Sequence, residues 1–158
     1  MFVSLDKIVS GGQTGADRAA LDAAIAFGIA HGGWCPRGRR AEDGHIPERY
    51  HLTETPRREY RQRTAWNVRD SDGTLLLVRK KITGGTRYTL QCIEESGRPF
   101  FVVNPDDRAA TAEVQHWLVI HLIRVLNIAG PRGSSDPAMY HSSRIFLDVL
   151  FSAVAGQR

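Results

Sequence analysis

Hydrophobic and polar positions alternate along the chain in blocks that predict strands followed by helices. A short β-prone run at 7–10 passes directly into a glycine-rich segment at 11–17, after which small and apolar side chains recur with helical spacing as far as Phe27. Two continuous apolar runs, 74–78 and 100–104, have the composition of strands that are covered on both faces. The first third of the chain and its middle therefore share a strand, loop and helix order.

Further helices complete this order. We predict them over 57–68, from the 80–86 loop through Glu95, from Thr111 to Leu126 and from Pro137 to about Ala155, with a short strand at 127–130. Strands that alternate with helices are typical of α/β units around a mostly parallel sheet with helices on both faces.

Local signals mark the ends of the first helix and the segment after it. Thr14 and Asp17 have the spacing of a capping box at its start, and Gly28 follows its last periodic residue. A short strand is expected within 29–34, a long loop over 36–49, and a small strand over 50–54.

The composition is that of an ordinary globular protein. The chain has 158 residues, 42% of them hydrophobic and 24% charged, which predicts a single domain over 1–158. Its formal net charge of +4 favours an anionic small-molecule ligand. Nucleic acid is not expected as a partner, because no basic stripe with interleaved aromatic residues is present.

The cysteines and the lack of long apolar stretches bear on location. Cys35 and Cys92 are far apart and form neither a zinc motif nor a disulfide framework, so we expect buried, reduced thiols and no protein metal site. No stretch approaches the roughly 18 apolar residues of a membrane span, and we expect a cytoplasmic protein with no membrane partner.

Three strand-to-helix junctions carry the candidate chemistry. Such junctions lie at the carboxyl ends of parallel strands, where ligands bind, and these three are rich in glycines, hydroxyls and backbone N–H donors that suit a phosphate. The loop residues that we expect to contact the ligand are Gly11, Gly12, Gln13, Thr14, Gly15, Thr83, Gly84, Gly85, Thr86, Gly130, Pro131, Arg132 and Ser134.

Other side chains are candidates for the same site. Arg132 and Arg18 supply guanidinium groups for a phosphate, and Trp34 supplies an aromatic wall for a base or pterin ring, although buried packing explains the tryptophan equally well. The glycines also have a purely steric explanation, and the loops match neither the P-loop nor the dinucleotide fingerprint. Arginines at 37, 39 and 40 form either a lid over the ligand or a solvated surface.

The last two predicted helices are apolar on more than one side. A helix that is hydrophobic nearly all round is buried, so these helices predict a homo-oligomer, a dimer or a tetramer, with deep burial inside one chain as the competing explanation.

Five stretches of the chain resemble the molybdenum-cofactor-carrier family. That family is similar to circularly permuted members of the Rossmann-like superfamily, which also holds the Lonely guy phosphoribohydrolases and the DNA-processing protein Smf. The stretches are 11–24, 50–56 (YHLTETP), 63–72, 83–86 and 126–132.

The resemblance implies a Rossmann-like three-layer fold, a pterin-phosphate or nucleotide ligand at the glycine loops, and oligomers. It implies molybdenum cofactor, or molybdopterin, as the ligand, whose metal is held by the pterin's own dithiolene sulfurs.

The phosphoribohydrolases suggest an enzymatic alternative. Their PGGxGTxxE motif carries a glutamate that acts on the ribosyl carbon of a nucleoside 5′-monophosphate, but the corresponding segment here is one residue shorter and has Thr89 in place of that glutamate. We therefore expect a binding protein. Asp17 would be the catalytic residue of a hydrolase that cleaves the N-glycosidic bond, if its side chain faces the ligand.

Overall fold

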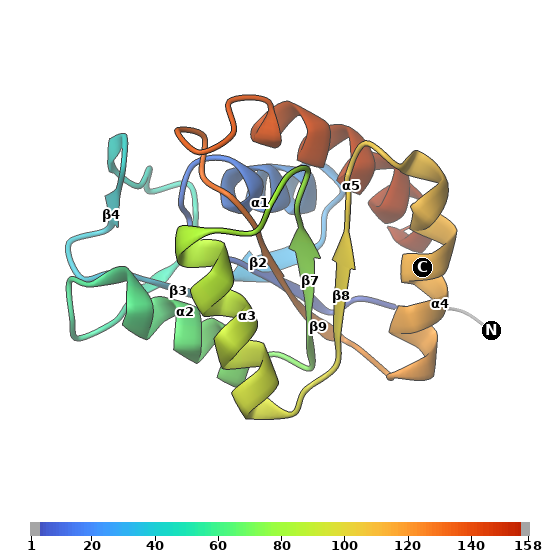
Figure 1. Cartoon of the computed structure of the whole chain (residues 1–158), viewed down its shortest axis with the longest axis horizontal. Coiled ribbons are helices and arrows are strands. Elements are labelled where there is room, and N and C mark those ends of the chain that lie inside the picture. The colour runs from blue at the N-terminus through green and yellow to red at the C-terminus, as the bar shows by residue number, and fades with distance from the viewer. Residues whose placement is uncertain (1–3, 156–158) are drawn as a thin grey trace.

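The computed structural model describes residues 4–155 and has a five-stranded parallel sheet at its centre (Figure 1). The strand order is β2-β1-β9-β7-β8, and every pair of neighbours is parallel. The strands are β1 (Lys7–Val9), β2 (Ala30–Gly32), β7 (Gly73–Leu77), β8 (Phe100–Val103) and β9 (Val125–Ala129).

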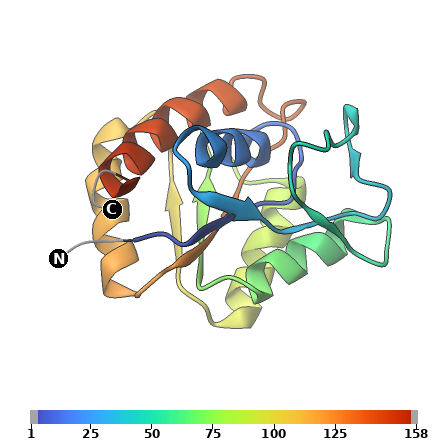
Figure 2. The ribbon, with the colours of Figure 1, turned by 180° about the vertical axis from the view of Figure 1, so that it is seen from behind.

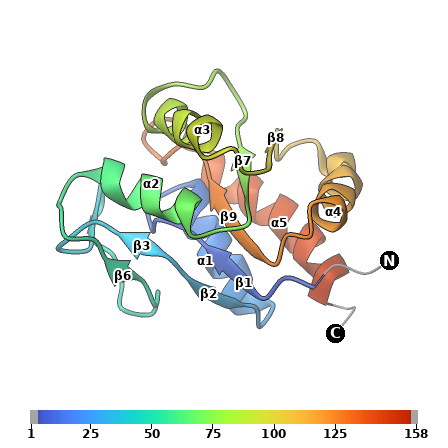
Figure 3. The same ribbon diagram turned by 90° about the horizontal axis from the view of Figure 1, so that it is seen from below.

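Helices cover both faces of this sheet, which confirms the predicted Rossmann-like three-layer α/β fold. Helices α2 and α3 lie on the face nearer the viewer in Figure 1, while α1 and α5 lie on the opposite face, which Figure 2 shows from behind, with α4 beside α5 in Figure 3. The helices are α1 (Ala16–Ala26), α2 (Tyr60–Arg69), α3 (Gly84–Ser96), α4 (Thr111–Ile120) and α5 (Met139–Ala155), with a short 3-10 turn at Arg108–Ala110 before α4.

The two predicted buried strands differ in their surroundings. All five residues of β7 are buried, because β7 lies between β9 and β8. Strand β8 is at the sheet edge, where Phe100 and Val102 are 43% and 42% exposed, so the prediction of a strand buried on both faces is wrong for this segment.

The predicted helix from Thr111 to Leu126 is too long. Helix α4 ends at Ile120, and Leu122 then takes a φ of 53°, which reverses the chain into β9. Val125 and Leu126 therefore belong to a strand that pairs with β1. The apolar run continues through this turn without a glycine or proline, and for that reason its periodicity conceals the boundary.

The capping box predicted at the start of α1 is absent. Gly15 is the N-cap residue, with no side-chain capping bond, and the Thr14 hydroxyl instead donates to Glu42. The Asp17 carboxylate accepts the N–H of Gln13 at 3.1 Å. Gly28, at a φ of 66°, follows the helix end as expected.

Residues 34–54 form an extension beside the sheet (Figure 1). Its elements are a parallel pair, β3 (Trp34–Cys35) with β6 (Thr53–Glu54), and a hairpin, β4 (Arg40–Ala41) with β5 (Gly44–His45). Arg39 is 8% exposed and donates to the carbonyls of Ile46, Pro47 and Tyr50, so it holds the extension together and is not a lid residue.

Burial inside one chain accounts for most of the apolar surface of α4 and α5. Val114 and Trp117 of α4 lie in the same core cluster as Phe146 and Leu150 of α5. Ile120, Leu122 and Val149 are left 59%, 79% and 44% exposed. No helix within residues 4–155 is long and apolar enough to cross a membrane.

Candidate functional site

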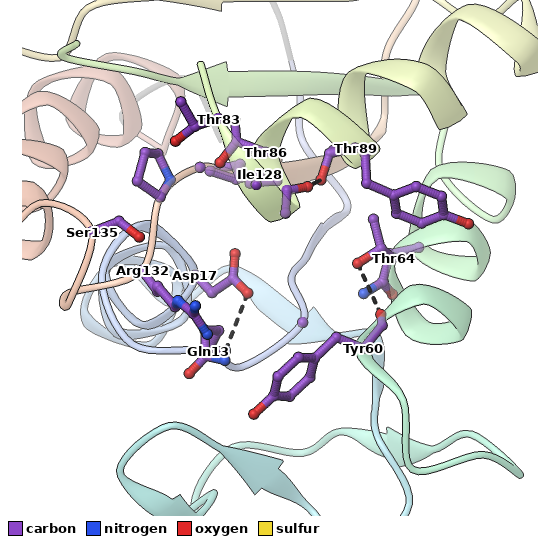
Figure 4. Close-up of a pocket in the computed structure, with 18 of the residues that line it drawn as sticks. Gln13, Asp17, Tyr60, Thr64, Thr83, Thr86, Thr89, Ile128, Arg132 and Ser135 are labelled. Atoms are coloured by element: carbon purple, nitrogen blue, oxygen red, sulfur yellow. Dashed lines mark hydrogen bonds between the residues drawn. The ribbon is translucent and has the colours of Figure 1, made fainter. Parts of the chain in front are cut away.

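A cavity of about 460 Å³ lies at the carboxyl ends of β1, β9 and β7. The helices after β1 and β7 run to opposite faces of the sheet, and the resulting crevice is where open α/β sheets bind their ligands. Figure 4 shows Gln13, Asp17 and Arg132 on one side of the cavity, Thr83 and Thr86 on another, and Tyr60 and Thr64 at one end. The other lining residues are Gly11, Arg61, Arg63, Asn67, Lys80, Lys81, Gly84, Gly85, Tyr88, Thr89, Asn127, Ile128, Ala129, Gly130, Pro131, Ser135 and Asp136.

The glycines of the three predicted loops serve different purposes. A Cβ at Gly15 or Gly130 would lie 2.4 Å from the carbonyl of Pro131 or 2.3 Å from that of Leu77, so these two glycines allow the loops to pack on one another. A Cβ at Gly85 meets no atom within 4 Å. The steric explanation therefore holds for two of the loops, and only the β7–α3 loop has open space beside its glycines.

Backbone donors of the β1–α1 loop already have acceptors, within the loop and in the β9–α5 loop. The N–H groups of Gln13 and Thr14 donate to the carboxylate of Asp17 and to the side-chain oxygen of Gln13, respectively. The N–H of Ala16 donates to the Pro131 carbonyl at 3.2 Å. A phosphate at this helix end would also meet the Asp17 carboxylate, which disfavours this loop as the phosphate contact.

The β9–α5 loop is occupied in a similar way. The N–H of Gly133 donates to the Thr14 hydroxyl, and the Ser134 N–H and hydroxyl both donate to the Glu42 carboxylate. Glu42 lies between the two strands of the β4–β5 hairpin. Its contacts therefore connect the extension to the β1–α1 and β9–α5 loops. Thr14 and Ser134, which we predicted as ligand contacts, therefore bind Glu42 and do not line the cavity.

The β7–α3 loop keeps its donors free. Within residues 4–155, no acceptor is bound to the N–H groups of Gly84, Gly85 and Thr86, which form the first turn of α3. The Thr86 hydroxyl also has no hydrogen bond in this part of the chain, although Thr86 is only 6% exposed. Free N–H groups at a helix N-terminus suit an anion.

Positive side chains line the cavity that this helix end faces. Lys80 and Lys81 lie in the β7–α3 loop and are exposed, and Arg61 and Arg63 reach the cavity from α2. Arg132 reaches it from the β9–α5 loop and also pairs with Glu42 at 3.6 Å. The only cavity-lining carboxylates among the described residues are Asp17 and Asp136. Both oxygens of Asp136 accept from Arg79 at 2.9 Å, so that charge is already paired. The cavity therefore favours an anionic ligand.

Asp17 is the one carboxylate that retains an oxygen for the cavity. Its Oδ2 atom accepts from Gln13, and its other oxygen points into the cavity (Figure 4). Burial raises the pKa of Asp17 to about 6, despite the opposing effects of Arg63, the Gln13 N–H, Arg18 and Ser10. A carboxyl group that titrates near neutral pH can donate or accept a proton.

Four more predicted contacts lie outside the cavity. Arg18 donates to the Gly12 carbonyl at 2.7 Å and forms an ion pair with Asp43 at 3.0 Å. Trp34 packs edge-on against Trp66, and its indole N–H donates to Asp70 at 2.8 Å. Gly12, which packs against Ile46 and Leu52, and Gly15 are also absent from the lining. Gly11, Gln13, Asp17, Gly130, Pro131, Arg132 and residues 83–86 do line it.

Helix α2 supplies cavity-lining residues that we did not predict. Tyr60, Arg63, Thr64 and Asn67 line the cavity from this helix. Their spacing of three and four residues places them on one face, and this polar stripe is the signal that could have identified them. Lys80, Lys81, Ser135 and Asp136 were likewise not among the predicted contacts.

The described residues contain no group of three or more His, Cys, Asp or Glu side chains that could hold a metal ion. Cys35 and Cys92 are buried and unpaired, as predicted.

Comparisons with known proteins agree with the resemblance found in the sequence. The model of the circularly permutated YpsA SLOG family matches residues 8–151. A crystal structure at 1.45 Å resolution of a protein from Syntrophus aciditrophicus SB, described as a "putative molybdenum carrier protein", is similar to this chain with a TM-score of 0.92. The two sequences are 44% identical, and the match covers 95% of this chain and 97% of the other. A search of curated proteins finds no match.

Proposed function

Because the chain belongs to the circularly permutated YpsA SLOG family, we propose that it binds a phosphate-bearing pterin, the molybdenum cofactor, and acts as its carrier. The observation that carries this proposal is the free N-terminus of α3, where unbound N–H groups and the buried Thr86 hydroxyl face a cavity lined by five Lys and Arg side chains. The likeness to the Syntrophus protein supports molybdenum cofactor over other phosphates.

Each end of such a ligand has a counterpart in the cavity. The phosphate accepts from the N–H groups of Gly84, Gly85 and Thr86, and the side chains of Lys80 and Lys81 neutralise its charge. The pterin's own dithiolene sulfurs would hold the molybdenum, so this role needs no metal ligand from the protein. A cavity of about 460 Å³ is also within the usual range for small-molecule sites.

A charge at Gly85 tests the phosphate contact. A Cβ added at Gly85 meets no atom within 4 Å, and Asp is favourable in the first turn of a helix, so Gly85→Asp retains the fold while it repels a phosphate. We expect its affinity for ribose 5-phosphate, measured by isothermal titration calorimetry, to fall at least about tenfold below that of the wild type. Gly85→Asn is the uncharged control of nearly the same shape and should lose much less. Equal affinities for all three proteins would refute the phosphate site.

A second candidate function is the hydrolysis of an N-glycosidic bond in a nucleoside 5′-monophosphate. Asp17 favours it, because its carboxyl group points into the cavity and has a pKa of about 6. Thr89 cannot take this role, since its hydroxyl donates to the Gly85 carbonyl within α3. Release of free base that is lost in Asp17→Asn would support hydrolysis, and no release from the common nucleotides would favour binding alone.

We propose in addition that the protein forms a homo-oligomer, a dimer or a tetramer, through its two C-terminal helices. The exposed Ile120, Leu122 and Val149 support this proposal, because they remain after the rest of the apolar surface of α4 and α5 is buried within the chain.

A further inference from the structure

Two buried charged side chains face the cavity and do not pair with each other. Arg63 of α2 and Asp17 of α1 are 8% and 7% exposed, and both line the cavity. Each is the strongest opposite charge acting on the other, yet no ion pair joins them. Buried charges are costly unless they are paired and hydrogen-bonded, so this separation needs an explanation.

Fixed contacts hold the two groups apart. The Nη1 atom of Arg63 donates to the Gly11 carbonyl at 2.7 Å, and its Nε atom donates to the Thr64 hydroxyl at 3.2 Å. Asp17 is held by the N–H of Gln13. These contacts prevent the two side chains from meeting directly, and they fix the direction in which each presents its remaining atoms.

Each group retains one hydrogen-bonding position for a ligand. The Nη2 atom of Arg63 has no acceptor within the described part of the chain. One oxygen of Asp17 points into the cavity (Figure 4). The cavity thus offers a donor and an acceptor that remain separate and are both shielded from bulk water.

The complementary ligand edge has a carbonyl oxygen next to an N–H group. A carbonyl accepts from Arg63, and the adjacent N–H donates to Asp17. This lactam edge occurs in the pyrimidinone ring of pterins and in hypoxanthine and guanine. Adenine presents an amino donor and a ring-nitrogen acceptor in the opposite order. A phosphate bound at α3 fixes the direction of the ring, so adenine cannot simply turn over to match.

We infer that Asp17 and Arg63 recognise the lactam edge of the ligand's heterocycle, which makes the site selective for pterin-like and oxopurine rings over adenine. This inference rests on the proposed phosphate-binding function. It identifies the residues that bind the ring, which lies at the opposite end of the same ligand from the phosphate. Tyr60 and Asn67 also line the cavity from the same helix as Arg63.

Inosine and adenosine 5′-monophosphates form a matched pair of probes. They differ only in the edge concerned, and ribose 5-phosphate lacks the ring altogether. In calorimetric titrations of the full chain, we expect inosine monophosphate to bind at least about tenfold more tightly than adenosine monophosphate, since a mismatched ring leaves buried polar groups unpaired. We expect Asp17→Asn to reduce this preference to less than about threefold without weakening the binding of ribose 5-phosphate.

Asp22→Asn is the control, because Asp22 lies on the same helix but accepts from the hydroxyls of Tyr50 and Tyr140 outside the cavity. It should retain the full preference. Equal binding of the two nucleotides to the wild type, or an Asp17→Asn variant that retains the preference, would overturn the lactam inference alone. If ribose 5-phosphate itself does not bind, the phosphate site fails, and the lactam inference fails with it.

Discussion

Replacement of Asp17 by Asn should stabilise the protein, and the gain should grow with pH. The pKa of this carboxyl group is about 6 in the folded protein, against an ordinary value of 3.8. A carboxyl group with a raised folded pKa favours folding below its unfolded pKa, and this contribution is lost as pH rises through the folded pKa. The ionised carboxylate therefore costs the wild type up to about 3 kcal/mol above pH 7, because a pKa raised from 3.8 to about 6 is worth about 1.4 kcal/mol per pH unit.

Asparagine removes this cost and keeps the contact. Its side-chain oxygen can accept the Gln13 N–H that Asp17 accepts now. Urea unfolding of the wild type and Asp17→Asn should show a gain near 3 kcal/mol at about pH 8 and about 1 kcal/mol at about pH 4.5. Asp22→Asn should show no such gain, because two phenol hydroxyls stabilise that carboxylate. A destabilised Asp17→Asn variant, or a gain independent of pH, would refute the conclusion that Asp17 is buried at an energetic cost.

Two further predictions concern the extension and the C-terminal helices. Arg39→Met should lower the free energy of unfolding by about 3 kcal/mol in urea titrations, because the buried guanidinium satisfies several carbonyls of the extension; a loss below about 0.5 kcal/mol would contradict this role. Leu122→Asp should shift the protein to monomers in analytical ultracentrifugation while its melting temperature is retained, since Leu122 is 79% exposed at a positive φ that Asp tolerates; an unchanged sedimentation coefficient would exclude Leu122 from the interface.

Sequence patterns identified the sheet and the edge at which the site lies. The apolar runs and the glycine-rich junctions were sufficient for this, because strand burial and strand-to-helix turns leave local signals. The exceptions are β8 and the start of β9. Strand β8 is apolar although it lies at an edge, and the turn at Leu122 has no glycine or proline to mark it.

Sequence could not show which of the three loops is free to bind a ligand. The loops have similar compositions, but contacts from distant segments occupy two of them. Glu42 takes the donors of the β9–α5 loop, and the Pro131 carbonyl takes that of Ala16 in the β1–α1 loop. Such occupation depends on the tertiary fold and leaves no trace in the local pattern.

The contribution of α2 was missed for a different reason. Its many charges are typical of a solvated helix, yet Arg63 is buried against the Gly11 carbonyl and Asn67 is buried against the backbone of Trp34 in β3. A buried arginine in a charge-rich helix is hard to predict, because its burial depends on partners such as the Gly11 carbonyl, which is 52 residues away.

Native mass spectrometry of protein purified rapidly without oxygen, from a host that makes molybdenum cofactor, tests the central claim most directly. We predict that the wild type retains the mass of a phosphate-bearing pterin and that Gly85→Asp, prepared in the same way, does not. A wild type that carries no such mass, or a Gly85→Asp variant that retains it equally, would contradict the proposal that the free N-terminus of α3 holds the ligand.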